Sequence, residues 1–217
     1  MPNIKTHIIG LTGYASAGKD TVADLLVTHA GFRKLAFADA LKAELVDAFQ
    51  VEPLVFTRPE YKSHPMAALA LSRCTDPGYV GAALQHLAPQ NAGVVISAEL
   101  ALPRTPRETM QMWGTQYRRA ADSDHWTAIV RRSIGYYISQ CHERAFVITD
   151  CRFANEVETL RALGGWLWQI KRPGIDAGTT SEGAHASATE GAEFAPDAVI
   201  NNAHDIRHLQ QLVLGEY

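Results

Sequence analysis

Gly13, Gly18 and Lys19 have the spacing of a phosphate-binding loop. The stretch Gly13-x-x-x-x-Gly18-Lys19 follows a short apolar run at residues 7–11 and leads into a helical pattern. Glycines at these positions let the backbone curl so that several N–H groups face one anion, and the positive end of the helix adds to that attraction. Lys19 is expected to reach the β- and γ-phosphates of a nucleotide. The alternative is a chance glycine-rich turn.

Asp20 stands where such loops usually carry a Ser or Thr that binds Mg²⁺. A carboxylate is also a hard oxygen ligand, but it repels phosphate unless a cation lies between them. We therefore expect Asp20 to face the metal, directly or through water, and Thr21 to contact a phosphate. The alternative is that Asp20 only complements the helix dipole.

Strands alternate with helices along most of the chain, which predicts an α/β fold with a parallel sheet covered on both faces. Thr105-Pro106-Arg107-Glu108 predicts a helix start with a capping box, and Asn155 with Glu158 predicts another helix start. Apolar runs predict strands at 7–11, 32–37, 145–149, 166–170 and 198–200.

Two segments interrupt this alternation, so we expect one domain, residues 1–217, with two insertions. Residues 51–103 contain recurring prolines and no clear period, and we expect them to form an insertion on the acceptor side. Residues 171–196 are rich in Gly, Ala, Ser and Thr and predict a mobile loop that acts as a lid.

Composition excludes several classes of protein. Hydrophobic residues make up 47% of the 217 residues, which argues against disorder, and the net charge of −3 shows no basic excess for nucleic-acid binding. Three scattered cysteines without a CxxC pair argue against a zinc site or disulfides. Residues 77–98 lack charge, but their Gln, His, Asn and Pro residues would be costly in lipid. Without a signal peptide or membrane span, we expect a cytoplasmic protein.

Several stretches, taken together, resemble the deoxynucleoside monophosphate (dNMP) kinases of bacteriophages and some bacterial genomes. The resemblance covers most of the chain and is weakest at 51–102. The stretches are GKDT (18–21), FADALK (37–42), TPRETMQMWGTQYRR (105–119), ITDCRFANE (148–156) and DAVINN (197–202).

The resemblance implies a P-loop NTPase three-layer fold, with a parallel five-stranded sheet flanked by helices, an NMP-binding insertion and a lid. It implies that ATP, with Mg²⁺, donates its γ-phosphate to a dNMP, and it allows a homodimer. The residues expected to bind ATP are Gly13, Tyr14, Ala15, Ser16, Ala17, Gly18, Lys19, Asp20, Thr21 and, at the base of the lid, Arg172.

Lys19, Asp150 and Arg152 are the expected catalytic residues. Asp150 ends a predicted strand and is expected to hold Mg²⁺, together with Asp20, or to orient water. The alternative role for Asp150 is to cap a helix. Arg152 is expected to neutralise phosphate charge in the transition state, and the alternative is a surface arginine.

The acceptor dNMP is expected to contact a second group of residues. Asp39 fits acceptor contact and helix capping equally well. Arg107 in a first helical turn opposes the helix dipole, which suggests an anionic ligand, although it also fits a solvated residue. The expected acceptor-binding residues are Phe37, Asp39, Lys42, Arg107, Gln111, Arg118 and Glu156, and the aromatic residues Trp113, Tyr117 and Trp126 are expected in the core rather than stacked on a base.

Some questions stay open at this stage. The roles of His185, Ser187 and Glu190 in the lid are undecided, as is the choice of base. Alternative functions are another small-molecule P-loop kinase, similar to dephospho-coenzyme A kinase, or a non-catalytic ATP-binding regulatory module. The Asn-Lys-x-Asp guanine signature of GTPase switches does not occur in the sequence.

Overall fold

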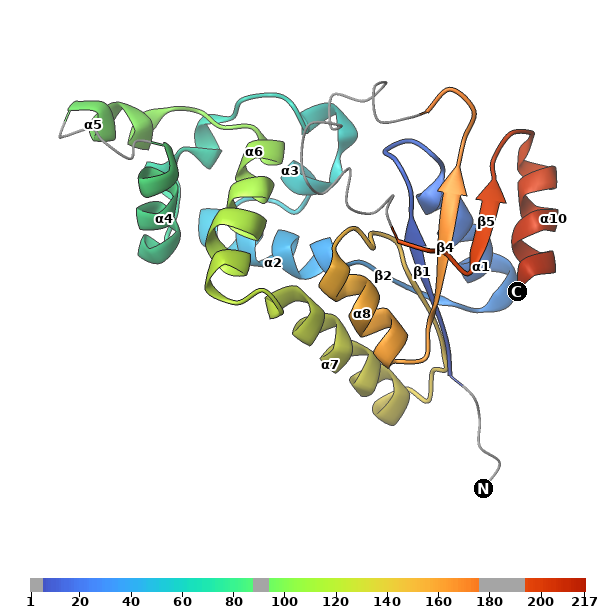
Figure 1. Cartoon of the computed structure of the whole chain (residues 1–217). Coiled ribbons are helices and arrows are strands. Elements are labelled where there is room, and N and C mark those ends of the chain that lie inside the picture. The colour runs from blue at the N-terminus through green and yellow to red at the C-terminus, as the bar shows by residue number, and fades with distance from the viewer. Residues whose placement is uncertain (1–5, 88–93, 176–193) are drawn as a thin grey trace. The chain divides into compact units, whose positions relative to one another are not determined.

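The computed structural model describes residues 6–87, 94–175 and 194–217 (Figure 1). The chain forms two compact units. The first unit comprises Met1–Phe37 and Thr127–Tyr217, and the second unit is Ala38–Trp126. The expectation that the two units work as one kinase domain stays a prediction.

A five-stranded parallel sheet forms the centre of the first unit. Its strands are β1 (His7–Thr12), β2 (Arg33–Leu35), β3 (Ala145–Ile148), β4 (Trp166–Lys171) and β5 (Ala198–Asn201). Their order is β2-β3-β1-β4-β5, which places β1 in the middle. In register, Gly10 of β1 lies between Ile148 of β3 and Leu167 of β4. Chain connections run to opposite sides of the sheet from this centre, and ligands of such sheets bind where that direction changes.

Helices cover both faces of this sheet, as Figure 1 shows. Ile9 and Leu11 of β1 pack with α1 (Lys19–Ala30) and α10 (Ile206–Glu216) in one buried cluster. The intervening Gly10 faces α8 (Ala154–Ala162), because a side chain there would strike Leu160 and Cys151. On the same side, Tyr137 of α7 (His125–Gln140) contacts Phe146 of β3. The predicted three-layer α/β fold with a parallel five-stranded sheet is thus confirmed.

The described part of the second unit contains helices joined by loops, with one isolated antiparallel bridge between Met66 and Arg104. It begins with α2 (Phe37–Phe49), whose first residue belongs to the first unit. Residues 51–103, left unassigned from the sequence, contain α3 (Leu54–Thr57), α4 (Pro77–Leu87), α5 (Val94–Ala101) and the 3₁₀ turns Pro59–Tyr61, Ala67–Leu69 and Leu71–Arg73. The last helices are α6 (Pro106–Gln111) and η4 (Met112–Arg119).

Three local expectations change. The strand expected at 32–37 ends at Leu35, because Phe37 already begins α2. The helix α8 begins at Ala154, so the Asn155–Glu158 cap is wrong. The helix that follows the confirmed Thr105 capping box continues as a π-helix, η4, rather than as an α-helix. π-Helical turns are rare and frequent at functional sites.

None of the described helices is long and apolar enough to cross a membrane.

Candidate functional site

The loop between β1 and α1 has the curled backbone that an anion cradle needs. Gly13 and Gly18 have φ angles of 134° and 103°, and Ser16 also has a positive φ of 64°. Positive φ is nearly free for glycine but costs about 1–2 kcal/mol for a residue such as Ser16. Strained backbone of this kind concentrates at ligand-binding sites. Gly18 is the N-cap of α1, so the positive end of the helix dipole lies at the loop.

The side chain of Lys19 is hydrogen-bonded to the backbone of the loop. Its Nζ donates hydrogen bonds to the carbonyl oxygens of Gly13, at 2.7 Å, and of Tyr14, at 2.8 Å. These contacts fold the ammonium group back over the curled backbone.

The loop sits against the ends of β4 and β5. A side chain on Gly13 would lie 2.3 Å from the carbonyl oxygen of Ile170 in β4. On the other side, the side-chain amide of Asn202 donates a hydrogen bond of 3.0 Å to the carbonyl oxygen of Ala17. Gly13 is therefore required by close packing as well as by its φ angle.

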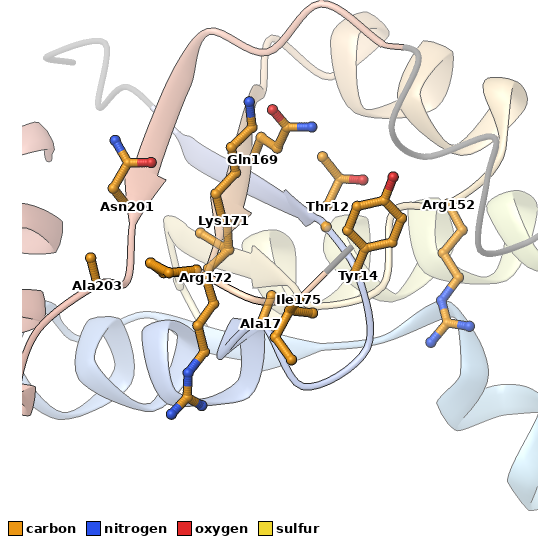
Figure 2. Close-up of a pocket in the computed structure, with 13 residues that line it drawn as sticks. Thr12, Tyr14, Ala17, Arg152, Gln169, Lys171, Arg172, Ile175, Asn201 and Ala203 are labelled. Atoms are coloured by element: carbon orange, nitrogen blue, oxygen red, sulfur yellow. The ribbon is translucent and has the colours of Figure 1, made fainter. Parts of the chain in front are cut away.

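A cavity of about 400 Å³ opens at this loop, between the carboxyl ends of β1 and β4 (Figure 2). Arg152, Lys171 and Arg172 all line it, and none of the 13 residues around it carries a carboxylate. In Figure 2, Arg152 and Arg172 flank Tyr14 and Ala17. The other lining residues are Thr12, Gly13, Gln169, Ile170, Pro173, Ile175, Asn201 and Ala203. Three cations without a balancing carboxylate suit an anionic ligand.

Asp150 and Glu156 organise the segment that carries Arg152. The Asp150 Oδ1 atom accepts the backbone N–H of Phe37 at 2.8 Å, so this carboxylate caps α2 across the sheet edge rather than the helix that follows it. Glu156 is 2% exposed, and its Oε2 atom accepts the backbone N–H groups of Arg152, at 2.8 Å, and Phe153, at 3.1 Å. Contact of Phe37 and Glu156 with the acceptor stays a prediction. The side chain of Phe37 is buried.

Asp20 lies on the outer side of α1. Its carboxylate is 82% exposed and forms an ion pair of 3.0 Å with Lys34, which also pairs with Asp24 at 3.0 Å. Burial lowers the pKa of Lys34, and hydrogen bonds to Asp24 and Asp20 outweigh that effect, so the pKa is raised. A metal role for Asp20 requires its side chain to leave Lys34. Exposed ion pairs of this kind contribute about 0–1 kcal/mol, so the cost of leaving is small.

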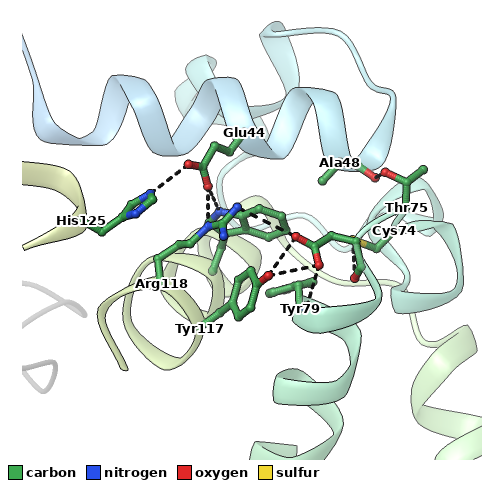
Figure 3. Close-up of polar contacts among 10 residues, drawn as sticks. Glu44, Ala48, Cys74, Thr75, Tyr79, Tyr117, Arg118 and His125 are labelled. Atoms are coloured by element: carbon green, nitrogen blue, oxygen red, sulfur yellow. Dashed lines mark hydrogen bonds and ion pairs between the residues drawn. The ribbon is translucent and has the colours of Figure 1, made fainter. Parts of the chain in front are cut away.

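In the second unit, Glu44 of α2 is the centre of a hydrogen-bond network (Figure 3). It accepts from Trp113 Nε1 at 2.7 Å and from Arg118 Nε at 2.7 Å, and it contacts His125 Nε2 at 3.0 Å. Burial alone raises the pKa of Glu44. The hydrogen bonds from Trp113, His125 and Arg118 outweigh burial, so the pKa of this carboxyl is lowered.

The same network holds Arg118, an expected phosphate ligand. Its guanidinium lies over the rings of Trp113, at 5.3 Å, and Tyr117, at 4.7 Å. Tyr117 in turn donates its hydroxyl to Asp76 at 3.0 Å. Arg118 is thus already engaged by a carboxylate and two rings, and phosphate binding by Arg118 stays a prediction. Trp113 and Trp126, which are 1% and 2% exposed, are confirmed as core residues.

The remaining acceptor-side candidates also lie in the second unit. Asp39 pairs with Lys42 at 3.4 Å within the first turns of α2, where both are partly exposed. The backbone N–H of Arg107 donates to the carbonyl oxygen of Lys62 at 3.1 Å, and Gln111 is the last residue of α6. The structure therefore gathers Gly13, Tyr14, Ala17, Arg152 and Arg172 around one cavity and places Asp39, Lys42, Arg107, Gln111 and Arg118 in the other unit.

Sequence reasoning missed several residues, among them Lys171 of the cavity wall. Asn202, whose side chain donates a hydrogen bond to the loop, lies in the DAVINN stretch. The resemblance of that stretch to the kinase family was the signal that could have pointed to it. Glu44 and Asp76 carried no motif. The lid candidates His185, Ser187 and Glu190 lie outside the described residues, as does most of the 171–196 segment.

Comparisons with known proteins agree with the motifs. A protein of Acanthamoeba polyphaga mimivirus, named "Putative deoxynucleotide monophosphate kinase", is 26% identical over 192 residues, which span 84% of this chain and 81% of that protein. This likeness confirms the predicted resemblance. No protein-family model matches the chain.

Solved structures align along nearly the whole chain. Dephospho-CoA kinase from Campylobacter jejuni aligns with 96% of this chain and 94% of its own, with 14% identity and a TM-score of 0.45. The protein TT1252 from Thermus thermophilus aligns with 98% of each chain, with 19% identity and a TM-score of 0.46. Both scores are below 0.5, so the fold assignment rests on the strand order and the loop of this chain.

Proposed function

We propose that this protein is a kinase that transfers the γ-phosphate of ATP to a deoxynucleoside monophosphate. The observation that carries the proposal is the curled loop after β1, which opens on a cavity of about 400 Å³ lined by three cations. The name of the mimivirus relative supports the choice of acceptor.

The first unit supplies the donor site. The N–H groups of the loop and the start of α1 bind the phosphates, and Lys19 moves from the Gly13 and Tyr14 carbonyls to the β- and γ-phosphates. Arg172 contacts ATP from the cavity wall. Arg152, whose backbone is held by Glu156, neutralises charge on the phosphoryl group in flight.

Of the two carboxylates expected to bind Mg²⁺, Asp150 is better placed than Asp20. Within the described residues, no three His, Cys, Asp or Glu side chains gather as a metal site, and Mg²⁺ in kinases is held mainly by phosphates, water and one or two carboxylates. Asp150, at the end of the strand beside β1, fits one such ligand, although its Oδ1 caps Phe37. Asp20 fits only after leaving Lys34. A bound Mg²⁺ would screen the phosphate charges that the acceptor oxygen must approach.

The second unit supplies the acceptor site in this proposal. Lys42 and Arg107 bind the acceptor phosphate, and Gln111 reads the edge of its base. Arg118, held by Glu44, contributes its charge from a fixed position. Asp39 either contacts the acceptor or restrains Lys42.

An acceptor panel tests the proposal. Purified protein is incubated with Mg²⁺, ATP and, separately, each of the common dNMPs, the matching ribonucleotides and dephospho-coenzyme A, and ADP release is measured. We expect acceptor-dependent ADP release with at least one dNMP and none with dephospho-coenzyme A. Lys19→Ala, with its charge removed from the loop, is the inactive control.

Each other outcome contradicts part of the proposal. Turnover of dephospho-coenzyme A alone would identify a different small-molecule kinase. ATP binding without acceptor-dependent ADP release would favour a regulatory module.

A further inference from the structure

Asn202 ties the phosphate loop to the ends of two strands. It follows β5 directly, and its backbone N–H donates to the carbonyl oxygen of Lys171, the last residue of β4, at 2.7 Å. Its side-chain Nδ2 donates to the carbonyl oxygen of Ala17 at 3.0 Å. One residue near the C-terminus therefore joins β4, β5 and the loop.

The Ala17 carbonyl matters because of the way such a loop binds anions. Loop N–H groups can face an anion only where the neighbouring carbonyl groups point elsewhere. Ala17 is 1% exposed, and a buried carbonyl without a partner is costly. The Asn202 amide supplies that partner.

Asn202 differs from the other side chain that holds the loop. Lys19 holds the carbonyl oxygens of Gly13 and Tyr14, but in the proposed function it must leave them to reach the phosphates. The Asn202 amide has no such second task. It can therefore hold the Ala17 carbonyl before and during phosphate binding.

Gly18 leaves room for the hydrogen bond between Asn202 and Ala17. A side chain on Gly18 would place its Cβ 2.4 Å from Nδ2 of Asn202, in addition to meeting the unfavourable φ of 103°. The second glycine of the loop motif thus leaves the space that the Asn202 amide occupies.

We infer that Asn202 is a positioning residue of the phosphate loop, which orients the loop N–H groups toward the phosphates through its hydrogen bond to Ala17. The inference rests on the proposed nucleotide-binding function. It predicts that losing the amide donor weakens phosphate binding in a protein that is still folded.

The experiment uses Asn202→Asp and Asn202→Ala in the full chain. Asn202→Asp keeps the size of the side chain but at pH 8 replaces the donor with an anion, and Asn202→Ala removes the donor without adding charge. Val199→Ala, an exposed position on β5 outside the loop cavity, is the matched control. Binding of ATP and of inorganic tripolyphosphate is measured by calorimetry, at a temperature where circular dichroism shows every variant folded.

We expect Asn202→Ala to weaken binding of both ligands about tenfold, the equivalent of one ordinary hydrogen bond, and Asn202→Asp to weaken it further. Val199→Ala should bind as the wild type does. Hydrogen exchange of the loop amides at residues 14–18 should be faster in both Asn202 variants, and this readout does not depend on affinity.

Two negative results have different meanings. If the wild type binds neither ATP nor tripolyphosphate, the proposed function fails. If the wild type binds them and the folded Asn202 variants bind equally well with unchanged loop exchange, Asn202 has no positioning role and the inference is overturned.

Discussion

Replacing Gly13 with alanine should show how tightly the phosphate loop is built into the sheet. The Cβ of Gly13→Ala would lie 2.3 Å from the carbonyl oxygen of Ile170 and 3.3 Å from its carbonyl carbon. Those atoms belong to the backbone of β4, which pairs with β1 up to Thr12 and Gln169. Neither the loop nor β4 can move aside without loss of that pairing.

The magnitude follows from two contributions. The φ of 134° lies outside the ordinary range of alanine, and such a conformation costs about 1–3 kcal/mol. Forcing a methyl group into packed backbone adds about 1–3 kcal/mol. We therefore expect Gly13→Ala to lower the free energy of unfolding by about 2–6 kcal/mol.

Gly31→Ala is the matched control. Gly31 also has a positive φ, of 69°, but a Cβ there would meet no atom within 4 Å. Only the conformational cost applies, so we expect a loss of about 1–2 kcal/mol. The comparison separates the close approach to Ile170 from the φ requirement that both glycines share.

Urea unfolding followed by circular dichroism measures both variants against the wild type. Hydrogen exchange of β1 and β4 amides shows whether the loss lies in the first unit. The expected pattern is a clearly larger loss for Gly13→Ala, with faster exchange in β1 and β4. Equal losses for the two variants would refute the reasoning, because the contact with β4 would then cost nothing.

Four further predictions concern ionisable residues. Glu44→Leu should lower the free energy of unfolding by about 2 kcal/mol, because charged hydrogen bonds are lost. Folding lowers the pKa of Glu44, so its stabilising effect should be present above the unfolded value of 4.5 and lost as the pH falls through the folded pKa. Urea unfolding at several pH values checks both expectations. Cys151 is fully buried, and burial raises its pKa, so a thiol reagent should label the exposed Cys141 in native protein and Cys151 only after unfolding, as mass spectrometry would show. Asp150→Asn retains an oxygen that can accept the N–H of Phe37, so it should leave stability nearly unchanged and lower kcat at least tenfold if its charge holds Mg²⁺; an unchanged kcat would reject the Mg²⁺ role. Asp20→Ala should weaken binding of Mg²⁺-ATP more than binding of metal-free ATP in calorimetry, whereas equal losses would reject a metal role for Asp20.

Local patterns were read correctly where one short stretch carries the whole signal. The glycine spacing predicted the curled loop, and Thr105 with Glu108 forms the predicted capping box. Each of these depends on residues within a few positions of one another. The sequence also predicted a strand at each of the five places where one lies, although β2 (Arg33–Leu35) is shorter than expected and only partly buried.

Patterns failed where a distant partner decided the outcome. Phe37 looked like the end of a strand, but the carboxylate of Asp150, which follows β3 in the chain, accepts its N–H and α2 begins there. The helix after Thr105 continues as a π-helix, and its Trp113 and Arg118 both donate hydrogen bonds to Glu44 of α2. The sequence contains these donors and acceptors but not their pairing.

The sequence by itself predicted the strands, the phosphate loop, and Arg152 and Arg172 beside it, since hydrophobic period, glycine position and charge are properties of neighbouring residues. Only the tertiary structure decided that Asn202 holds the Ala17 carbonyl, that Asp20 turns to Lys34, and that Glu44 engages Arg118. Those pairings depend on which elements pack together, because a hydrogen bond reaches only about 3 Å and forms only where folding brings both groups within that distance.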